Sequence, residues 1–491
     1  MISRPTLARS AQQALRNSSC ARTISGRRFA SASAGSGAFE TSDAAGLKVA
    51  ARESQGPTTK LAIVAKAGTR YQPLPGLAAG LESFAFKNTQ KRSGLRIIRE
   101  SELLGSQLTA YHTREALVLE ASFFRDDLPY FTELLAEVVS ETKFTTHEFH
   151  EEVQPVLRLK QSGVSAAAQA LDNAHSVAFH SGLGSPFNLT PSIPIKPYLS
   201  ETAVADFADA AYAKPNVALV ADGASAANVS KWAQQFFKQV PAASSGKLSL
   251  NSAATKYFGG ESRTYSANGN ALVIAFPGAV NGQASPELAV LAALLGGKSN
   301  IKWSPGFSLI SKALGPAPGV STSTTNFAYS DAGLLAVQLS GSAAGIRKAA
   351  EETVKALKTI SEGTVSKEDL TKAIAKAKFE ALEATEKRSG SILLAGSGLV
   401  HSGKAIDAAE SAKSVESVTA EKLKAAAKTI LDGKASFAAV GDLYALPYAE
   451  ELGLLCVLAR SVMDSKEAPS WMDPECSKAA NPAPKHPNVE L

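Results

Sequence analysis

The stretch of sequence that decides the fold is GLAAGLESFAFKNT, residues 76–89, which follows KAGTRYQ at residues 66–72. KAGTRYQ overlaps the end of a short apolar run, residues 60–68, and this run ends in glycine. A similar apolar run ending in glycine occupies residues 270–278, 210 positions later. Short apolar runs bounded by glycine are typical of buried strands, so the body of the chain is predicted to consist of two similar halves.

Two further pairs of segments support this duplication. ALVLEAS at residues 116–122 matches LLAVQLS at residues 334–340, and VALVAD at residues 217–222 matches FAAVGD at residues 437–442. The offsets are 218 and 220 positions, and the segments occur in the same order in both halves. A repeat of this length is too long for a solenoid and indicates a duplicated domain.

Helical patterns lie between the predicted strands. Apolar residues spaced by three and four predict helices over residues 128–139 and 346–360. Further charged helices are predicted near residues 145–172 and 366–387, the second with its start signal at Ser366. Each half is therefore predicted to be an α+β domain, a mixed sheet covered by helices on one face.

The N-terminal segment has a different composition from the body. Residues 1–29 contain six arginines and no Asp, Glu or Lys, which is typical of a mitochondrial transit peptide with a processing site near Phe29 or Ala30. This leader accounts for the whole formal net charge of +6, so the body is balanced and nucleic-acid binding is not indicated. No stretch reaches the ~18 apolar residues needed to span a bilayer, so no transmembrane segment is expected.

The predicted organisation has six parts. They are a transit peptide (1–29), a flexible N-terminus (30–44), a first domain (45–240), a linker (241–262), a second domain (263–455) and a Pro-rich tail (456–491).

Residues 66–89 resemble the active helix of the mitochondrial processing peptidase and pitrilysin family of zinc peptidases. Active members carry His-x-x-Glu-His there; the two histidines hold zinc and the glutamate activates a bound water. The resemblance places Ala79 and Ser83 at the histidine positions and Glu82 at the water-activating position. VLRL, residues 156–159, resembles the family's Ile-Leu-Arg-Glu, which places Leu159 at the position of the third ligand.

A methyl, a hydroxyl and an isobutyl group cannot hold zinc against water. The resemblance, which covers about residues 45–455, therefore implies a degenerate member of the family with no catalytic residues, no metal and no cofactor of its own. Glu82 is expected to be an inherited carboxylate, kept by hydrogen bonds in a cavity between the two domains.

Gly296, Gly297 and Lys298 lie where the family has a glycine-rich loop. The surrounding sequence is similar to that of a non-catalytic core subunit of a fungal respiratory-chain complex. This similarity implies a scaffold on the matrix side of the inner mitochondrial membrane, paired with a related core chain and supporting haem-bearing and iron–sulfur subunits. The alternative is the presequence-binding subunit of a processing peptidase, in which a longer glycine run is expected.

Several other sites are not indicated. A phosphate-binding loop needs glycine five residues before Gly297, and that residue is Ala292. The pair His147 and His150 belongs to a charged helical pattern and is expected to face solvent, while His175 and His180 are five residues apart, a spacing at which side chains diverge on a helix. The three cysteines form no Cys-x-x-Cys pair, so a structural zinc or haem site is not expected.

Overall fold

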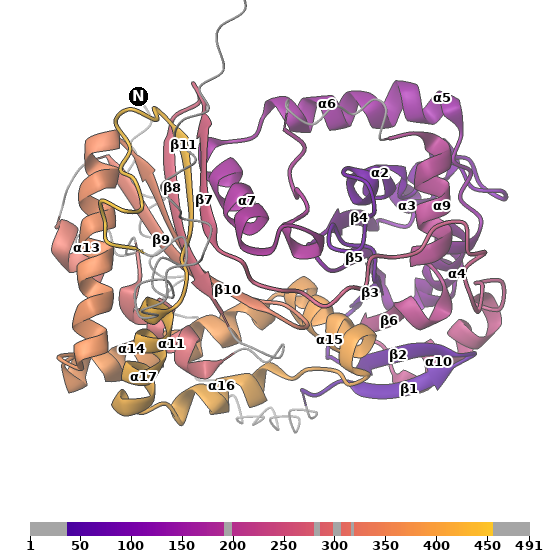
Figure 1. Ribbon diagram of the computed structural model, residues 1–491. Coiled ribbons are helices and arrows are strands. Elements are labelled where there is room, and N and C mark those ends of the chain that lie inside the picture. The colour runs from indigo at the N-terminus through magenta and orange to yellow at the C-terminus, as the bar shows by residue number, and fades with distance from the viewer. Residues whose placement is uncertain (1–36, 191–198, 279–284, 298–305, 316–318, 455–491) are drawn as a thin grey trace, which may run out of the picture.

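Two mixed β-sheets, each with helices packed against it, form the molecule (Figure 1). The structure is a computed structural model, and it describes residues 37–190, 199–278, 285–297, 306–315 and 319–454. The predicted α+β fold with two tandem domains is confirmed.

The first sheet has the strand order β1-β2-β6-β3-β5-β4. Strands β2 and β6 are parallel and the other neighbours are antiparallel. Its strands are β1 (Glu40–Ala44), β2 (Leu47–Arg52), β3 (Thr58–Ala65), β4 (Gln107–His112), β5 (Leu117–Phe124) and β6 (Val217–Asp222).

The second sheet has the order β7-β11-β8-β10-β9, which repeats the arrangement of the first, with no counterpart of β1 among the described residues. Strands β7 and β11 are parallel, as β2 and β6 are. The strands are β7 (Gly260–Tyr265), β8 (Asn270–Pro277), β9 (Val320–Ala328), β10 (Gly333–Gly341) and β11 (Ser436–Gly441). The three predicted strand pairs thus occupy equivalent places: β3 with β8, β5 with β10 and β6 with β11.

Two repeated glycines end the central strands for the same physical reason. A Cβ on Gly68 would lie 2.4 Å from the backbone of Arg114, and a Cβ on Gly278 would lie 2.4 Å from the backbone of Gly333. No side chain fits where two backbones approach this closely. The 210-residue spacing of these glycines therefore marks one structural position in both halves.

Most helices of the first half pack on one face of the first sheet. The helices of this half are α2 (Leu77–Phe84), α3 (Gly94–Leu103), α4 (Leu128–Ser140), α5 (Thr146–Glu148), the π-helix η2 (Phe149–Val153), α6 (Gln154–Ser162), α7 (Ala166–Phe179), α9 (Glu201–Ala211) and α10 (Ala226–Phe236), with single 3-10 turns η1 (Arg125–Asp127), η3 (Gly182–Gly184) and η4 (Lys214–Asn216).

The second half contains α11 (Pro286–Leu295), α12 (Leu309–Leu314), α13 (Ala343–Glu362), α14 (Lys367–Glu386), α15 (Arg388–Ser402), α16 (Ala408–Glu416) and α17 (Ala420–Asp432). The predicted start of α14 is confirmed, because the Ser366 hydroxyl accepts a hydrogen bond from the backbone N–H of Asp369.

The prediction of one continuous charged helix near residues 145–172 is wrong. Helix α6 ends at Ser162, with Gly163 as its C-cap, and α7 begins at Ala166. The Ser165 hydroxyl then caps α7 by accepting from the N–H of Ala168. Helix α7 leaves the first half and packs on β8 and β11 of the second sheet. Its small face of four buried alanines (Ala166, Ala170, Ala174 and Ala178) permits this close approach.

Helix α15 makes the reciprocal crossing from the second half to the first sheet (Figure 1). Ile392, Ala395 and Leu399 are buried against the face of the first sheet that its own helices leave open. A Cβ on Gly396 would lie 2.4 Å from Val64, so glycine permits the closest approach of this helix to β3. Each half is thus completed by a helix from the other.

Two predicted boundaries differ from the structure. Residues 40–44, assigned to a flexible N-terminus over 30–44, form β1. A two-residue turn with positive φ at Ala45 (58°) and Gly46 (77°) joins β1 to β2, and turns of this kind suit the twist of a hairpin. Strand β7 begins at Gly260, inside the predicted linker.

Candidate functional site

Helix α2 carries Ala79, Glu82 and Ser83, three of the four residues that the resemblance places at the peptidase site. It begins after Gly76, whose φ is 93°, and the Gln72 side-chain oxygen accepts from the N–H of Ala78 in the first turn. One face of the helix packs into the first core through Leu77, Leu81 and other apolar residues. Packing of this face directs Glu82 away from the core, toward β4 and α6.

Glu82 is held by two basic side chains, those of His112 and Lys160. His112, the last residue of β4, donates from Nδ1 to one carboxylate oxygen, and Lys160 on α6 donates to the other at 2.7 Å. Burial raises the pKa of the Glu82 carboxyl, but hydrogen bonds and charge from His112 and Lys160 outweigh burial and hold this pKa below its ordinary value. Glu82 therefore stays ionised and ties α2, β4 and α6 together.

The three predicted ligand positions carry no group that could bind a metal tightly. Ala79 is buried, and the Ser83 hydroxyl is engaged in donating to the carbonyl of Ala79 at 2.9 Å. Leu159 lies on α6 beside Lys160, with 74% of its surface exposed. Within the described residues, no group of three or more His, Cys, Asp or Glu side chains is placed to hold a metal ion. The residues present do not fit zinc.

The structure identifies the hydrogen-bond partners of Glu82. Both partners, His112 and Lys160, come from the same half of the molecule as Glu82. Neither partner was found from the sequence. Both are single residues far from Glu82 in the chain, and only the packing of β4 and α6 on α2 brings them close.

Gly296 and Gly297, the described part of the predicted glycine loop, are fixed by contacts with β9. Gly296 ends α11 with φ 67°, and its carbonyl accepts from the Thr324 hydroxyl at 2.6 Å. A Cβ on Gly297 would lie 2.4 Å from the carbonyl oxygen of Thr322 on β9. Lys298, like the predicted processing site at Phe29 and Ala30, lies outside the described residues.

The histidines singled out by the sequence form no site. His147 is exposed and pairs with Glu151 at 3.2 Å, as expected for a solvated helix face. His175 is buried, with Nε2 2.8 Å from the hydroxyl of Tyr329, and burial lowers the pKa of its imidazole to about 3. His180 stacks on Phe258.

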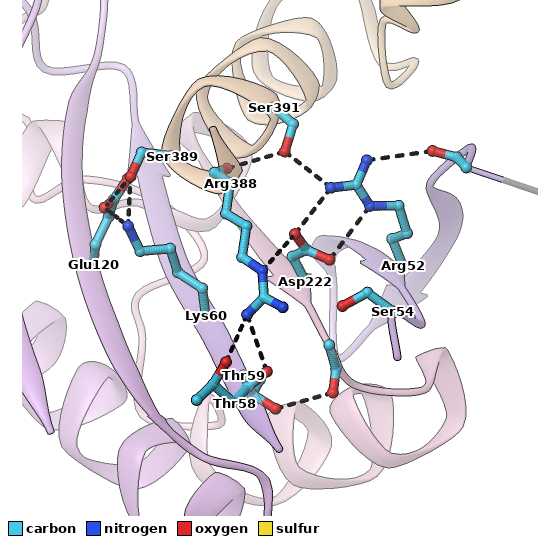
Figure 2. Close-up of polar contacts among 12 residues, drawn as sticks. Arg52, Ser54, Thr58, Thr59, Lys60, Glu120, Asp222, Arg388, Ser389 and Ser391 are labelled. Carbon is cyan, nitrogen blue, oxygen red and sulfur yellow. Dashed lines mark hydrogen bonds and ion pairs between the residues drawn. The ribbon is translucent and has the colours of Figure 1, made fainter. Parts of the chain in front are cut away.

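Polar side chains fix the start of α15 to the first sheet (Figure 2). The buried carboxylate of Asp222, at the end of β6, accepts from Arg52 at 2.9 Å and lies 3.7 Å from Arg388 of α15. Arg388 also donates to the Thr58 carbonyl at 3.1 Å. These contacts join segments more than 160 residues apart in the chain and orient α15 on the sheet.

A second set of ion pairs, centred on Arg70, also joins the halves. Arg70 donates to Glu115 at 2.6 Å and to Asp331, in the turn between β9 and β10, at 2.7 Å. Burial raises the pKa of the Asp331 carboxyl, but hydrogen bonds from Arg70 and Thr255 hold it below its ordinary value. A cavity of about 310 Å³ beside this cluster is lined by residues of both halves, including Lys66 and His401.

The comparison with known families agrees with this architecture. The insulinase family (peptidase family M16) matches residues 48–188, and the peptidase M16 inactive domain matches residues 198–377. Together these matches cover more than half of the chain and include most strands of both sheets, but not β1 or β11.

Similar proteins have one name in common, "Cytochrome b-c1 complex subunit 2, mitochondrial". The protein of Neurospora crassa is 61% identical over 455 residues, which cover 92% of this chain and 100% of that protein. The protein of Schizosaccharomyces pombe is 39% identical over 412 residues, covering 83% and 93%. That of Mus musculus is 26% identical over 416 residues, covering 83% and 90%.

A tandem pair of these α+β domains defines the class of protein as a peptidase M16 homologue. This chain belongs to that family and, within it, to the family of the mitochondrial cytochrome b-c1 complex subunit 2 proteins. It is a degenerate, non-catalytic member.

Proposed function

We propose that this chain is a core subunit of the mitochondrial cytochrome b-c1 complex (ubiquinol–cytochrome c reductase, or complex III) and that it acts as a scaffold. Its partners in this proposal are core protein 1 and the cytochrome b, cytochrome c1 and Rieske iron–sulfur subunits of a dimeric complex. The high identity to proteins named as subunit 2 of that complex, across nearly the whole chain, supports this assignment.

The observation that carries the scaffold role is the state of Glu82. In a zinc peptidase this carboxylate must receive a proton from a metal-bound water. Here its two oxygens accept hydrogen bonds from His112 and Lys160, while the neighbouring position 79 holds a methyl group. A carboxylate occupied in this way contributes to packing between α2, β4 and α6 and has no role as a base.

The proposal places the chain at the inner mitochondrial membrane, peripheral and on the matrix side. No helix among the described residues is long and apolar enough to cross a membrane. The transit peptide proposed for residues 1–29, with cleavage near Phe29 or Ala30, would deliver the chain to the matrix. We also propose that the domains predicted over residues 45–240 and 263–455, extended to include β1 in the first and the start of β7 in the second, make the scaffold.

The assignment is tested on mitochondria solubilised in mild detergent. The protein is captured through a C-terminal tag, run on a native gel, and the visible spectrum of its band is recorded. We expect a large band with b- and c-type haem absorption. A haem-free band of roughly twice the chain mass with zinc-dependent presequence cleavage would contradict the proposal.

We further propose that Ala79, Glu82, Ser83 and Leu159 mark a vestigial peptidase site. The triple variant Ala79→His, Ser83→His and Leu159→Glu restores the family's ligand set on α2 and α6. Zinc bound per chain is then measured after dialysis, with Ala79→His alone as the control. We expect about one zinc in the triple variant and none in the control; a triple variant without zinc would contradict this placement.

A further inference from the structure

The two sheets differ at one edge. In the first sheet β2 is covered by β1, whereas in the second sheet the equivalent strand β7 has β11 as its only strand neighbour among the described residues. We propose that the outer edge of β7 receives an extended segment from another subunit, which adds a sixth strand to the second sheet. This inference rests on the proposed function, because the partner is another chain of the same complex.

The backbone of β7 defines which groups are free to pair. The N–H of Gly260 donates to the carbonyl of Ala435, and the N–H of Ser266 donates to that of Gly441. Because N–H and C=O groups alternate in direction along a strand, even-numbered residues of β7 face β11. The N–H and C=O groups of Glu261, Arg263 and Tyr265 therefore point to the open edge, where no described strand meets them.

Charged side chains often protect a sheet edge from pairing, but those of β7 are directed elsewhere. The Arg263 guanidinium donates to the carbonyls of Leu443 at 2.6 Å and Pro447 at 2.9 Å, and it lies 3.8 Å from the ring centroid of Tyr448. Its other contact is an ion pair with Glu261 at 3.2 Å. Arg263 thus holds the segment after β11 and pairs with Glu261, so both charges of β7 already have partners within this chain.

Tyrosine side chains surround this edge. Tyr265 lies on β7 itself, and Tyr444 and Tyr448 lie on the segment that Arg263 holds. They are the only strongly exposed tyrosines among the described residues, and Tyr444 is fully exposed. Tyrosine is enriched in protein interfaces because its ring buries a large area at a small entropic cost. We infer an occupant with aliphatic side chains at alternate positions, which would pack against these rings.

The first sheet supplies the template for the pairing. Strand β1 runs antiparallel to β2, and its Ser42 hydroxyl lies 2.9 Å from that of Ser230 on α10, the helix that follows β6. In the second half, the described chain after β11 contains no helix corresponding to α10. Among its described residues the second half therefore has neither a sixth strand nor a helix to support it, and an antiparallel strand from a partner would complete the sheet.

Amide hydrogen exchange tests this pairing at the level of single residues. The isolated full chain is compared with the purified complex, using fragmentation that resolves residues 260–266. We expect the amides of Glu261, Arg263 and Tyr265 to exchange about tenfold or more slowly in the complex. The amides of Ser262 and Thr264 already face β11 and should change little. Equal exchange of the odd-numbered amides in a complex that contains the chain would overturn the inference.

Failure of the chain to enter the complex would instead contradict the proposed function, so the two failures are distinguishable. A photoreactive phenylalanine analogue at Tyr444 identifies the occupant, with the same analogue at the exposed Phe379 of α14 as control. We expect crosslinks from position 444 to one extended segment of another subunit. Crosslinks only within this chain, only to a second copy, or none at all would overturn the inference.

A matched pair of variants provides an independent check. Glu261→Pro removes one outward N–H, whereas Glu261→Ala keeps it, and proline is tolerated on edge strands. We expect Glu261→Pro to lower recovery of the chain in the complex several-fold relative to Glu261→Ala. Equal recovery of the two variants would contradict pairing at this edge.

Discussion

The first half of the molecule partly buries a carboxylate, that of Glu82, at a place where the second half buries only apolar side chains. Helix α2 follows β3 and carries Glu82, which needs His112 and Lys160 as partners. Helix α11 is the first described helix after β8, the equivalent of β3, and its buried residues are all Leu, Val or Ala. The helices that follow the equivalent strands β3 and β8 thus differ. Helix α2 combines apolar packing with the polar contacts of Glu82, whereas the buried residues of α11 are all apolar.

The sheet faces that α7 and α15 cover show a related difference. Helix α7 docks on the second sheet through alanines, whereas α15 docks on the first through a glycine and a polar N-terminus. Close helix–sheet contact is achieved by small residues in both cases. The contact of α15 also includes the ion pair between Arg52 and the buried Asp222, so this contact should be sensitive to single polar substitutions.

Gly396→Leu should have the largest effect, because it separates α15 from the first sheet. A Cβ at this position already meets Val64 at 2.4 Å, and a longer side chain would displace the helix. We expect the free energy of unfolding in urea to fall by ~3 kcal/mol or more. Ser397→Ala on the same helix is the control, with an expected change of about 0.5 kcal/mol or less. Equal values for the two would contradict the docking.

His112→Ala should have the next largest effect. It removes a partner of a largely buried carboxylate and is expected to cost ~1–3 kcal/mol of unfolding free energy. Lys160 is half exposed, so Lys160→Met should cost only ~0.5 kcal/mol. A larger loss for Lys160→Met than for His112→Ala would show that the exposed ion pair, and not the buried hydrogen bond, holds Glu82.

The pH dependence of stability isolates Glu82 itself. Because the pKa of this carboxyl is lowered in the folded state, its ionised form stabilises the fold above the unfolded pKa of roughly 4.3. That contribution is lost as the pH falls through the lower, folded pKa. The stability difference between wild type and Glu82→Gln should therefore be greatest near neutral pH and shrink in acid. A difference that grows in acid would contradict the assignment.

Ala45→Gly should have the smallest effect and the opposite sign. Ala45 adopts φ 58° in the β1–β2 turn, a conformation that glycine adopts without strain. We expect a gain of ~0.5 kcal/mol in unfolding free energy. Ala50→Gly, on the neighbouring strand β2, is the control and should destabilise by about as much. A loss of stability in Ala45→Gly would show that the turn favours alanine.

The sequence was sufficient for the features that depend on local pattern. The duplicated strands, the glycines at 68 and 278 and the start of α14 follow from periodicity, spacing and capping residues. Strand β1 was missed because Ala45-Gly46 is a weak turn signal compared with Asn-Gly. The exchange of α7 and α15, and the partners of Glu82, were missed because they depend on contacts between residues far apart in the chain.

The most direct test of the account measures complex III on native gels from mitochondria that lack the chromosomal copy of this gene. The cells express wild type, Glu82→Gln or Gly396→Leu, and the haem in the complex is quantified together with the amount of the chain. The account predicts near wild-type complex with Glu82→Gln and a large loss with Gly396→Leu, because the joined halves act as a scaffold and the carboxylate has no chemical role. Loss of the complex with Glu82→Gln, at a normal amount of the chain, would contradict it.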